Sequence, residues 1–217
     1  LADAGDGNHA YIDTLNEARK VLVDEMSSTL QIVARDVKIQ VEFNPAVVRE
    51  YRLVGYENRA LANEDFNNDR VDAGEIGAGH TVTALYELTL VDGGTPSVDP
   101  LRYAQQGKPT PENSEFDGEL AFVKLRYKAP GEERSVLISR PVLTRDRVDD
   151  FADNSEDFRF AVAVAGFSQL LRNNTAIADF DYDRVLALAT PARGADPFGY
   201  RGEFLNLVRT AQVLSQP

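Results

Sequence analysis

The sequence predicts an α+β protein, in which an antiparallel β-sandwich follows an N-terminal helix and precedes a three-helix segment. Three observations predict this order. Hydrophobic residues recur at helical spacing near the N-terminus, alternate along several segments in the middle, and return to helical spacing after about residue 149. We therefore expect three parts, over residues 1–34, 35–148 and 149–217.

The first part is predicted to be a short strand followed by a helix. The segment HAYI is short and apolar, and Thr14 with Glu17 has the pattern of a capping box. Over residues 15–33, apolar side chains recur at roughly helical spacing and make one stripe, which includes Leu30 and Val33. Such a stripe is expected to pack against another surface.

Five strands are predicted for the sandwich. The segment DVKIQVEF alternates strictly, with apolar residues from Val37 to Phe43 on one face and polar residues from Asp36 to Glu42 on the other. This is the pattern of a half-buried antiparallel strand. Two long connections, over residues 58–79 and 92–118, interrupt the strands. The other four strands begin at Val47, His80, Glu119 and Arg134.

Three helices are predicted after residue 149. The first has Asn154 or Ser155 as its N-cap, with acidic residues in its first turn. The second follows Asp181, and the third starts at Asp196 with Pro197 in the first helical position. We expect these amphipathic helices to form a small bundle or a layer on the sandwich.

Composition excludes several classes of function. The 23 basic and 35 acidic residues give a formal charge of −12, which repels nucleic acid and anionic lipid. The absence of cysteine removes disulfides, thiolate zinc sites and cysteine nucleophiles. The most apolar stretch, residues 160–167, is far shorter than the ~20 residues of a membrane helix, so no direct membrane insertion is expected. The chain opens without a methionine or a leader pattern, and we expect it to be part of a longer protein.

The main candidate site is NEDFNNDRVDAGE, residues 63–75, where acids and asparagines are concentrated. Asp65, Asn67 and Asp69 fit the first, third and fifth positions of a calcium loop, but arginine replaces the glycine at the sixth and isoleucine the glutamate at the twelfth. A non-standard site would add oxygens from two further acids. The candidate metal ligands are then Asp65, Asn67, Asp69, Asp72 and Glu75.

Two other interpretations of this segment stay open. Asparagine and aspartate are common in hydrogen-bonded turns, so the segment can be a solvated Asx-rich turn without metal. A pair of its carboxylates could also act as general acid and base, although nothing in the sequence indicates an apolar pocket around them. The two histidines, His9 and His80, are far apart, and no Gly-x-Ser-x-Gly motif occurs. We therefore expect no enzymatic activity and no obligatory cofactor.

The chain resembles the C-terminal region of bacterial von Willebrand factor type A domain proteins of the YfbK-like kind. The resemblance covers nearly the whole chain and includes Phe66, the Asn67-Asn68 pair and the turn at residues 72–74. The blocks that carry it are GNHAYIDTLNEARKVLVDE, DVKIQVEFNPAVVREYRLVGYENRAL, EDFNNDRVDAGEIGAGHTVTALYEL, ELAFVKLRYKAP and DPFGYRGEFLNLVRTA.

The resemblance implies that residues 1–34 are the last strand and helix of a type A domain, separated here from its other elements. The Asp-x-Ser-x-Ser motif of that domain's metal-ion-dependent adhesion site does not occur, so magnesium-dependent ligand binding is not expected. In this family the region after residue 34 has no established function. The family's proteins commonly carry an export or lipoprotein signal, which implies a location in the periplasm or at the cell surface.

Two function classes follow. In the first, the chain is a non-catalytic accessory domain that supports the type A domain of the full-length protein and helps it bind a protein partner. In the alternative, it is a calcium-stabilised adhesion or surface-binding module that uses the loop from Asp65 to Glu75. A hydrolase is a third class, and it requires a deep pocket with convergent polar groups.

Overall fold

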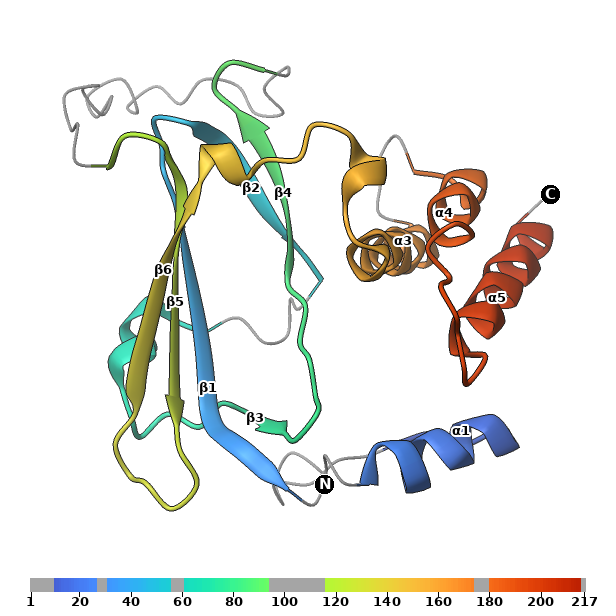
Figure 1. Cartoon of the computed structure of the whole chain (residues 1–217), viewed down its shortest axis with the longest axis horizontal. Helices are drawn as coiled ribbons and strands as arrows, with labels where there is room; N and C mark the ends of the chain where they lie inside the picture. The colour runs from blue at the N-terminus through green and yellow to red at the C-terminus, as the bar shows by residue number, and fades with distance from the viewer. Residues whose placement is uncertain (1–9, 27–30, 56–60, 94–115, 174–179, 216–217) are drawn as a thin grey trace. The chain divides into compact units, whose positions relative to one another are not determined.

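The computed structural model describes residues 10–26, 31–55, 61–93, 116–173 and 180–215 (Figure 1). The chain divides into two compact units. The first comprises Leu1–Glu50, Arg59–Val82 and Thr89–Arg145, and the second comprises Tyr51–Asn58, Thr83–Leu88 and Asp146–Pro217. Most of the predicted connection at residues 92–118 lies outside the described residues.

The N-terminal helix is shorter than the sequence predicts. Helix α1 (Leu15–Arg19) continues into a π-helical turn, η2 (Lys20–Asp24). The Thr14 hydroxyl accepts a hydrogen bond from the Glu17 amide at 3.1 Å, which confirms its predicted role as a cap. Residues 10–12 are not in a strand, so the prediction of a strand there is wrong, and His9 lies outside the described residues.

The predicted helical stripe also extends too far, because Val33 belongs to strand β1 (Ile32–Phe43). The start of β1 pairs with β3 (Gly74–Gly77), with Ile32 opposite Gly77. Ladder hydrogen bonds and the β-branched side chains of Ile32 and Val33 favour the extended conformation over a continued helix. Strand β3 was not predicted, since its four residues contain only one large apolar side chain.

The larger sheet has the order β3-β1-β5-β6, and its described pairings are antiparallel. Strand β5 (Glu119–Lys128) lies between β1 and β6 (Val136–Leu143). The register places Ile39 opposite Leu125, and Leu125 opposite Ile138, on one face of the sheet. Lys38 lies opposite Arg126 on the other face. Strands β2 (Val48–Val54) and β4 (Leu85–Leu90) form a second, two-stranded sheet.

Three helices follow a pair of 3-10 turns, η7 (Thr144–Asp146) and η8 (Phe151–Asp153). They are α3 (Glu156–Leu171), α4 (Tyr182–Ala189) and α5 (Tyr200–Leu214). Ser155, one of the two predicted caps, caps α3. Helix α4 follows Asp181 as predicted, and Asp181 is its cap. The α+β class is thus confirmed. The helices share an apolar core of Ala163, Val185, Ala189, Leu205 and Val208.

The predicted start of α5 is wrong by one turn. Asp196 and Pro197 lie in a turn before the helix, whose N-cap is Gly199 with φ of 79°. Glycine adopts a left-handed backbone conformation without steric cost, and this conformation at Gly199 keeps the helix from starting earlier. The Asp196 carboxylate nevertheless accepts hydrogen bonds from the amides of Arg201 and Gly202 at 3.1 and 2.8 Å. It therefore satisfies first-turn amides from outside the helix.

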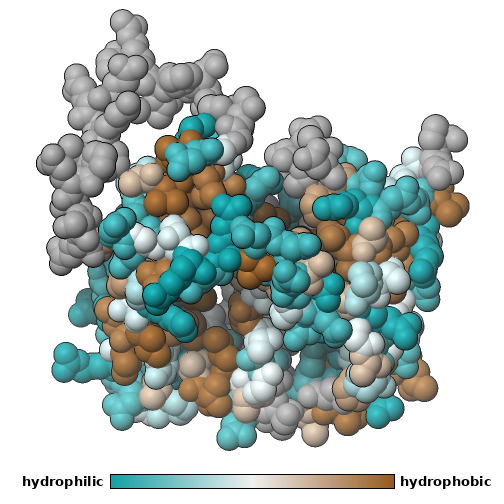
Figure 2. Space-filling model, turned by 45° about the horizontal axis from the view of Figure 1, so that its top comes forward, coloured by the Kyte–Doolittle hydropathy of each residue, from teal (hydrophilic) through white to brown (hydrophobic). Residues whose placement is uncertain are grey.

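The described helices include none that is both long enough and apolar enough to cross a membrane. On the face seen in Figure 2, apolar residues are interspersed with hydrophilic ones. The exposed large apolar side chains include neighbours in sequence, such as Leu22 with Val23 and Leu137 with Ile138.

Candidate functional site

Residues 63–73 cover one face of the larger sheet. They begin with the 3-10 turn η4 (Asn63–Asn67) and end before β3. Phe66 is only 4% exposed, and its ring lies 5.7 Å from the guanidinium of Arg126 on β5. A cation over an aromatic face is attracted by the ring's quadrupole. Phe66 therefore attaches the acidic segment to the sheet.

Lys38 lies beneath this segment and is 3% exposed. Its ammonium donates to the backbone carbonyl of Asn68 at 2.5 Å and to that of Asp65 at 3.4 Å. A buried ammonium requires such acceptors, because it has lost its hydration. The sequence predicted that Lys38 lies on the solvent face of β1 and Ile39 on the buried face. This is wrong, since Ile39 is 47% exposed and residues 63–73 cover Lys38.

A second buried cation, Lys128, joins the segment to β1. Its ammonium lies 2.7 Å from the Asp36 carboxylate and donates to the carbonyl of Asp69 at 2.8 Å. The Ala73 amide donates to Asp36 at 3.2 Å. Asp36 occupies a left-handed conformation, with φ of 50°, at an irregularity in the β1–β5 register between Arg35 and Lys38. This bulge places its carboxylate beside Lys128.

These contacts shift the pKa values of Asp36 and Lys128. Burial raises the pKa of Asp36, but the hydrogen bond and charge of Lys128 and the Ala73 amide outweigh burial, so the pKa lies below its ordinary value of 3.8. The hydrogen bond to Asp36, against the opposing effect of desolvation, raises the pKa of Lys128 above its ordinary value of 10.5. Both groups are therefore charged at neutral pH.

Arg126 and Ser135 complete the attachment. Arg126 donates to the Asn67 side-chain oxygen and to the Ser135 hydroxyl, both at 3.0 Å. The Ser135 amide donates to the Asp69 carboxylate at 3.3 Å. The hydrogen bonds from Ser135, aided by the charges of Lys128 and Arg126, lower the pKa of Asp69. This network holds the segment against β5 and the residues just before β6.

The structure assigns different roles to the predicted metal ligands. Asn67 and Asp69 accept hydrogen bonds from side chains and amides of the sheet, and Asp65 directs its carbonyl toward Lys38. Among the described residues, no three acidic or histidine side chains are grouped to hold a metal ion. The calcium site stays a prediction. Its predicted ligands were Asp65, Asn67, Asp69, Asp72 and Glu75.

Sequence reasoning missed the cations that hold this segment. Lys38, Arg126 and Lys128 lie on one face of neighbouring strands, opposite a segment rich in acids and asparagines. The alternation of Lys124, Arg126 and Lys128 along β5 was the available signal, because residues two apart share a face. This alternation indicates a cationic face of the sheet, whose charged groups require oxygen acceptors or water.

Residues 28–214 match the family described as "Uncharacterized protein YfbK, C-terminal". The chain belongs to this family. It is 47% identical, over 211 residues, to the "Uncharacterized protein YfbK" of Escherichia coli strain K12. The match covers 97% of this chain but 35% of that relative, so the chain spans about a third of its length. No solved structure matches the chain.

Proposed function

We propose that this chain is a non-catalytic interaction domain of a longer bacterial protein, in which it supports a von Willebrand factor type A domain and helps that domain bind a protein partner. Family membership supports an origin in a longer protein, since the E. coli relative extends far beyond the matched region. We also propose that this longer protein contains a type A domain, on the basis of the sequence resemblance.

The observation that carries the proposal is the apolar surface of the N-terminal helix. Leu15, Leu22, Val23 and Met26 are 86, 60, 62 and 52% exposed. Leu15 lies in α1, Leu22 and Val23 lie in η2, and Met26 lies two residues after η2, so the four side chains favour a single contact surface rather than scattered exposure. Clustered apolar side chains of this size are typical of surfaces that contact other protein. The missing contact would be supplied by the remaining elements of the type A domain.

The carboxylates of Asp36 on β1 and Asp69 in the acidic segment support a non-catalytic role. A catalytic carboxylate commonly has a pKa raised toward neutral pH by an apolar pocket. Asp36 and Asp69 show the opposite direction, because Lys128 and Ser135 stabilise their charged forms. These groups attach a loop to a sheet. We also propose a location in the periplasm or at the cell surface, as the export signals common in YfbK-like proteins imply.

The test is binding between this chain and the separately produced portion of the E. coli relative that the match leaves out. We expect calorimetry to detect a complex, and we expect Leu22→Glu to weaken it by at least about tenfold, since a buried charge without a partner is costly. Val213→Glu is the matched control, because Val213 is 71% exposed on α5. Equal binding by the Leu22 variant and the wild type would contradict the proposal.

A further inference from the structure

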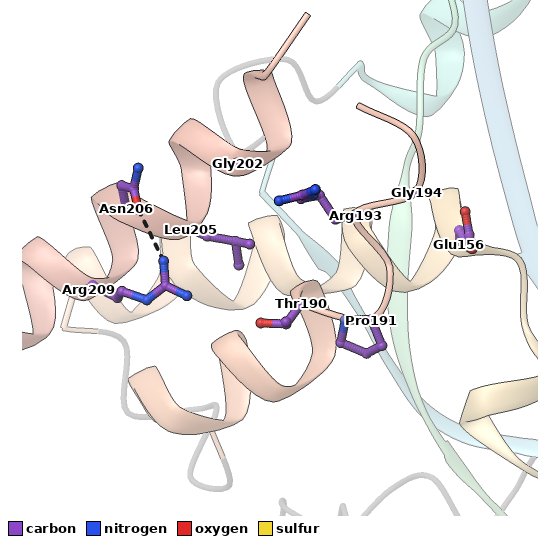
Figure 3. Close-up of a pocket in the computed structure, with 9 residues that line it drawn as sticks. All are labelled: Glu156, Thr190, Pro191, Arg193, Gly194, Gly202, Leu205, Asn206 and Arg209. Carbon is purple, nitrogen blue, oxygen red and sulfur yellow. Dashed lines mark hydrogen bonds between the residues drawn. The ribbon is translucent and has the colours of Figure 1, made fainter. Parts of the chain in front are cut away.

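A surface cavity of about 590 Å³ lies within the helical unit, between α5 and the end of α4 with the loop that follows it (Figure 3). Polar and charged side chains dominate its lining, and Leu205 provides an apolar patch. Two arginines line it, Arg193 from the loop and Arg209 from α5. The only acidic side chain among its lining residues is Glu156, from the first turn of α3.

The loop that forms one wall is held by Arg201. Its guanidinium donates to the Ala192 carbonyl at 2.8 Å and forms an ion pair with the Asp157 carboxylate. The same guanidinium lies 4.8 Å from the centre of the Phe160 ring. Ala192 itself is fully buried. These contacts fix the start of the loop against α3, so the cavity wall is formed without a ligand.

Arg193 and Arg209 differ from Arg201 in their partners. Neither is within ion-pair distance of a carboxylate in the part of the chain that the structure describes. Arg209 donates to the side-chain oxygen of Asn206 at 3.1 Å, which orients its guanidinium. Both arginines therefore contribute positive charge to one cavity of a chain that has 35 acidic and 23 basic residues.

Glu156 does not neutralise this pair. Figure 3 shows it at one end of the cavity and Arg209 at the other, with Arg193 between them. A Cβ atom added to Gly194 would lie 2.9 Å from a Glu156 carboxylate oxygen, so Glu156 packs closely against the loop backbone at this glycine. The guanidinium end of the cavity is therefore electropositive, and the Glu156 end is not.

We propose that the cavity binds a small oxyanion, a carboxylate or a phosphate, between Arg193 and Arg209. A guanidinium presents parallel N–H donors that match two oxygens of either group. The preformed wall lowers the ordering cost of binding. Because both arginines are solvent-exposed, the interaction is screened by salt, and a dissociation constant of roughly 1 mM is expected.

The test titrates the full 217-residue chain with inorganic phosphate and, separately, with succinate, at constant ionic strength maintained with sodium chloride. Backbone amide shifts of residues 190–209 report binding at the cavity. We expect saturation with at least one anion. We expect Arg193→Gln and Arg209→Gln each to weaken binding by about tenfold, because each loses charge-assisted hydrogen bonds.

The matched control is Arg184→Gln, since Arg184 is an exposed arginine on α4 that does not line the cavity. Its affinity should equal that of the wild type. Saturation by phosphate alone or by succinate alone would identify the source of the oxyanion. The inference is overturned if neither anion saturates below about 50 mM. It is also overturned if the Arg184 variant loses as much affinity as the cavity variants.

Discussion

The sheet face beneath residues 63–73 and the core of the helical unit bury different kinds of side chain. The sheet face buries Lys38 and Lys128, whose charges are met by Asp36 and by backbone carbonyls. The helical core buries five apolar residues, surrounded by rings such as Phe167 and Phe204, which meet edge to face at 5.5 Å. The first arrangement depends on ionisation and on hydrogen-bond geometry, whereas the second depends on apolar contact area.

This difference determines how each region should respond to a change. Removing one member of a buried ion pair leaves a charge without compensation. Removing methyl groups from an apolar core leaves a cavity, whose cost does not depend on pH. Because the chain has no tryptophan, local stability is best followed by hydrogen exchange on peptides from each region.

The largest effect is expected for Leu205→Ala in the helical core. Leu205 is 4% exposed, and truncating such a side chain should lower the free energy of unfolding by about 3 to 4 kcal/mol. Exchange should accelerate in peptides from α4 and α5. Leu207→Ala is the control, because Leu207 is 57% exposed on the same helix and should change stability by less than about 0.5 kcal/mol. Equal effects of the two substitutions would mean that Leu205 is not a core residue.

A loss of about 3 kcal/mol is expected for Asp36→Asn, which leaves Lys128 buried beside a neutral side chain. Asparagine tolerates the left-handed backbone at this position, so the substitution tests the charge. Urea unfolding, with exchange measured on peptides from β5, gives the value.

Glu42→Gln provides the comparison for this ion pair. Glu42 lies 3.7 Å from Lys124 and is 71% exposed, and exposed pairs contribute less than about 1 kcal/mol. A cost for Asp36→Asn no greater than that for Glu42→Gln would show that the Lys128 pair is not the stabilising contact we infer.

A smaller loss of stability, about 2 kcal/mol, is expected for Lys38→Met, because the carbonyls of Asp65 and Asn68 lose their donor.

The contacts of Lys38 also make a prediction about calcium binding by this segment. While the ammonium occupies these oxygens, millimolar calcium should leave the wild-type melting temperature unchanged, since a ligand shifts stability only if it binds the folded state. A calcium-specific rise of several degrees, lost in Asp65→Ala and Asp69→Ala, would instead support the calcium-stabilised module.

The smallest effect concerns pH. The pKa values of Asp36 and Asp69 are lowered on folding, so their stabilisation is complete above the ordinary aspartate value of 3.8 and is lost as pH falls through the lower folded-state values. We expect the protection of β5 peptides, corrected for the pH dependence of intrinsic exchange, to fall below about pH 4, and to do so less steeply in Asp36→Asn. The same acid sensitivity in peptides from α4 would argue against the contrast between the two regions.

The helical unit was the most predictable part of the fold. Ser155 is one of the two expected caps of α3, α4 follows Asp181 as expected, and strand β5 begins at the predicted Glu119, because capping and hydrophobic periodicity depend on residues close in sequence. The start of α5 and the end of the N-terminal helix were less predictable. At those places a left-handed Gly199 and the pairing of β1 with β3 override the local pattern.

The candidate site shows the same division. The residue pattern alone predicts that residues 63–75 are an acid-rich segment within a sheet protein, that β1 alternates, and that the fold is of the α+β class. Which face of β1 is covered depends on tertiary contacts. Lys38 becomes buried through carbonyls 27 and 30 residues away, and periodicity contains no information about such a distant contact. A loop's position depends on long-range packing and charge pairing, which local sequence patterns do not specify.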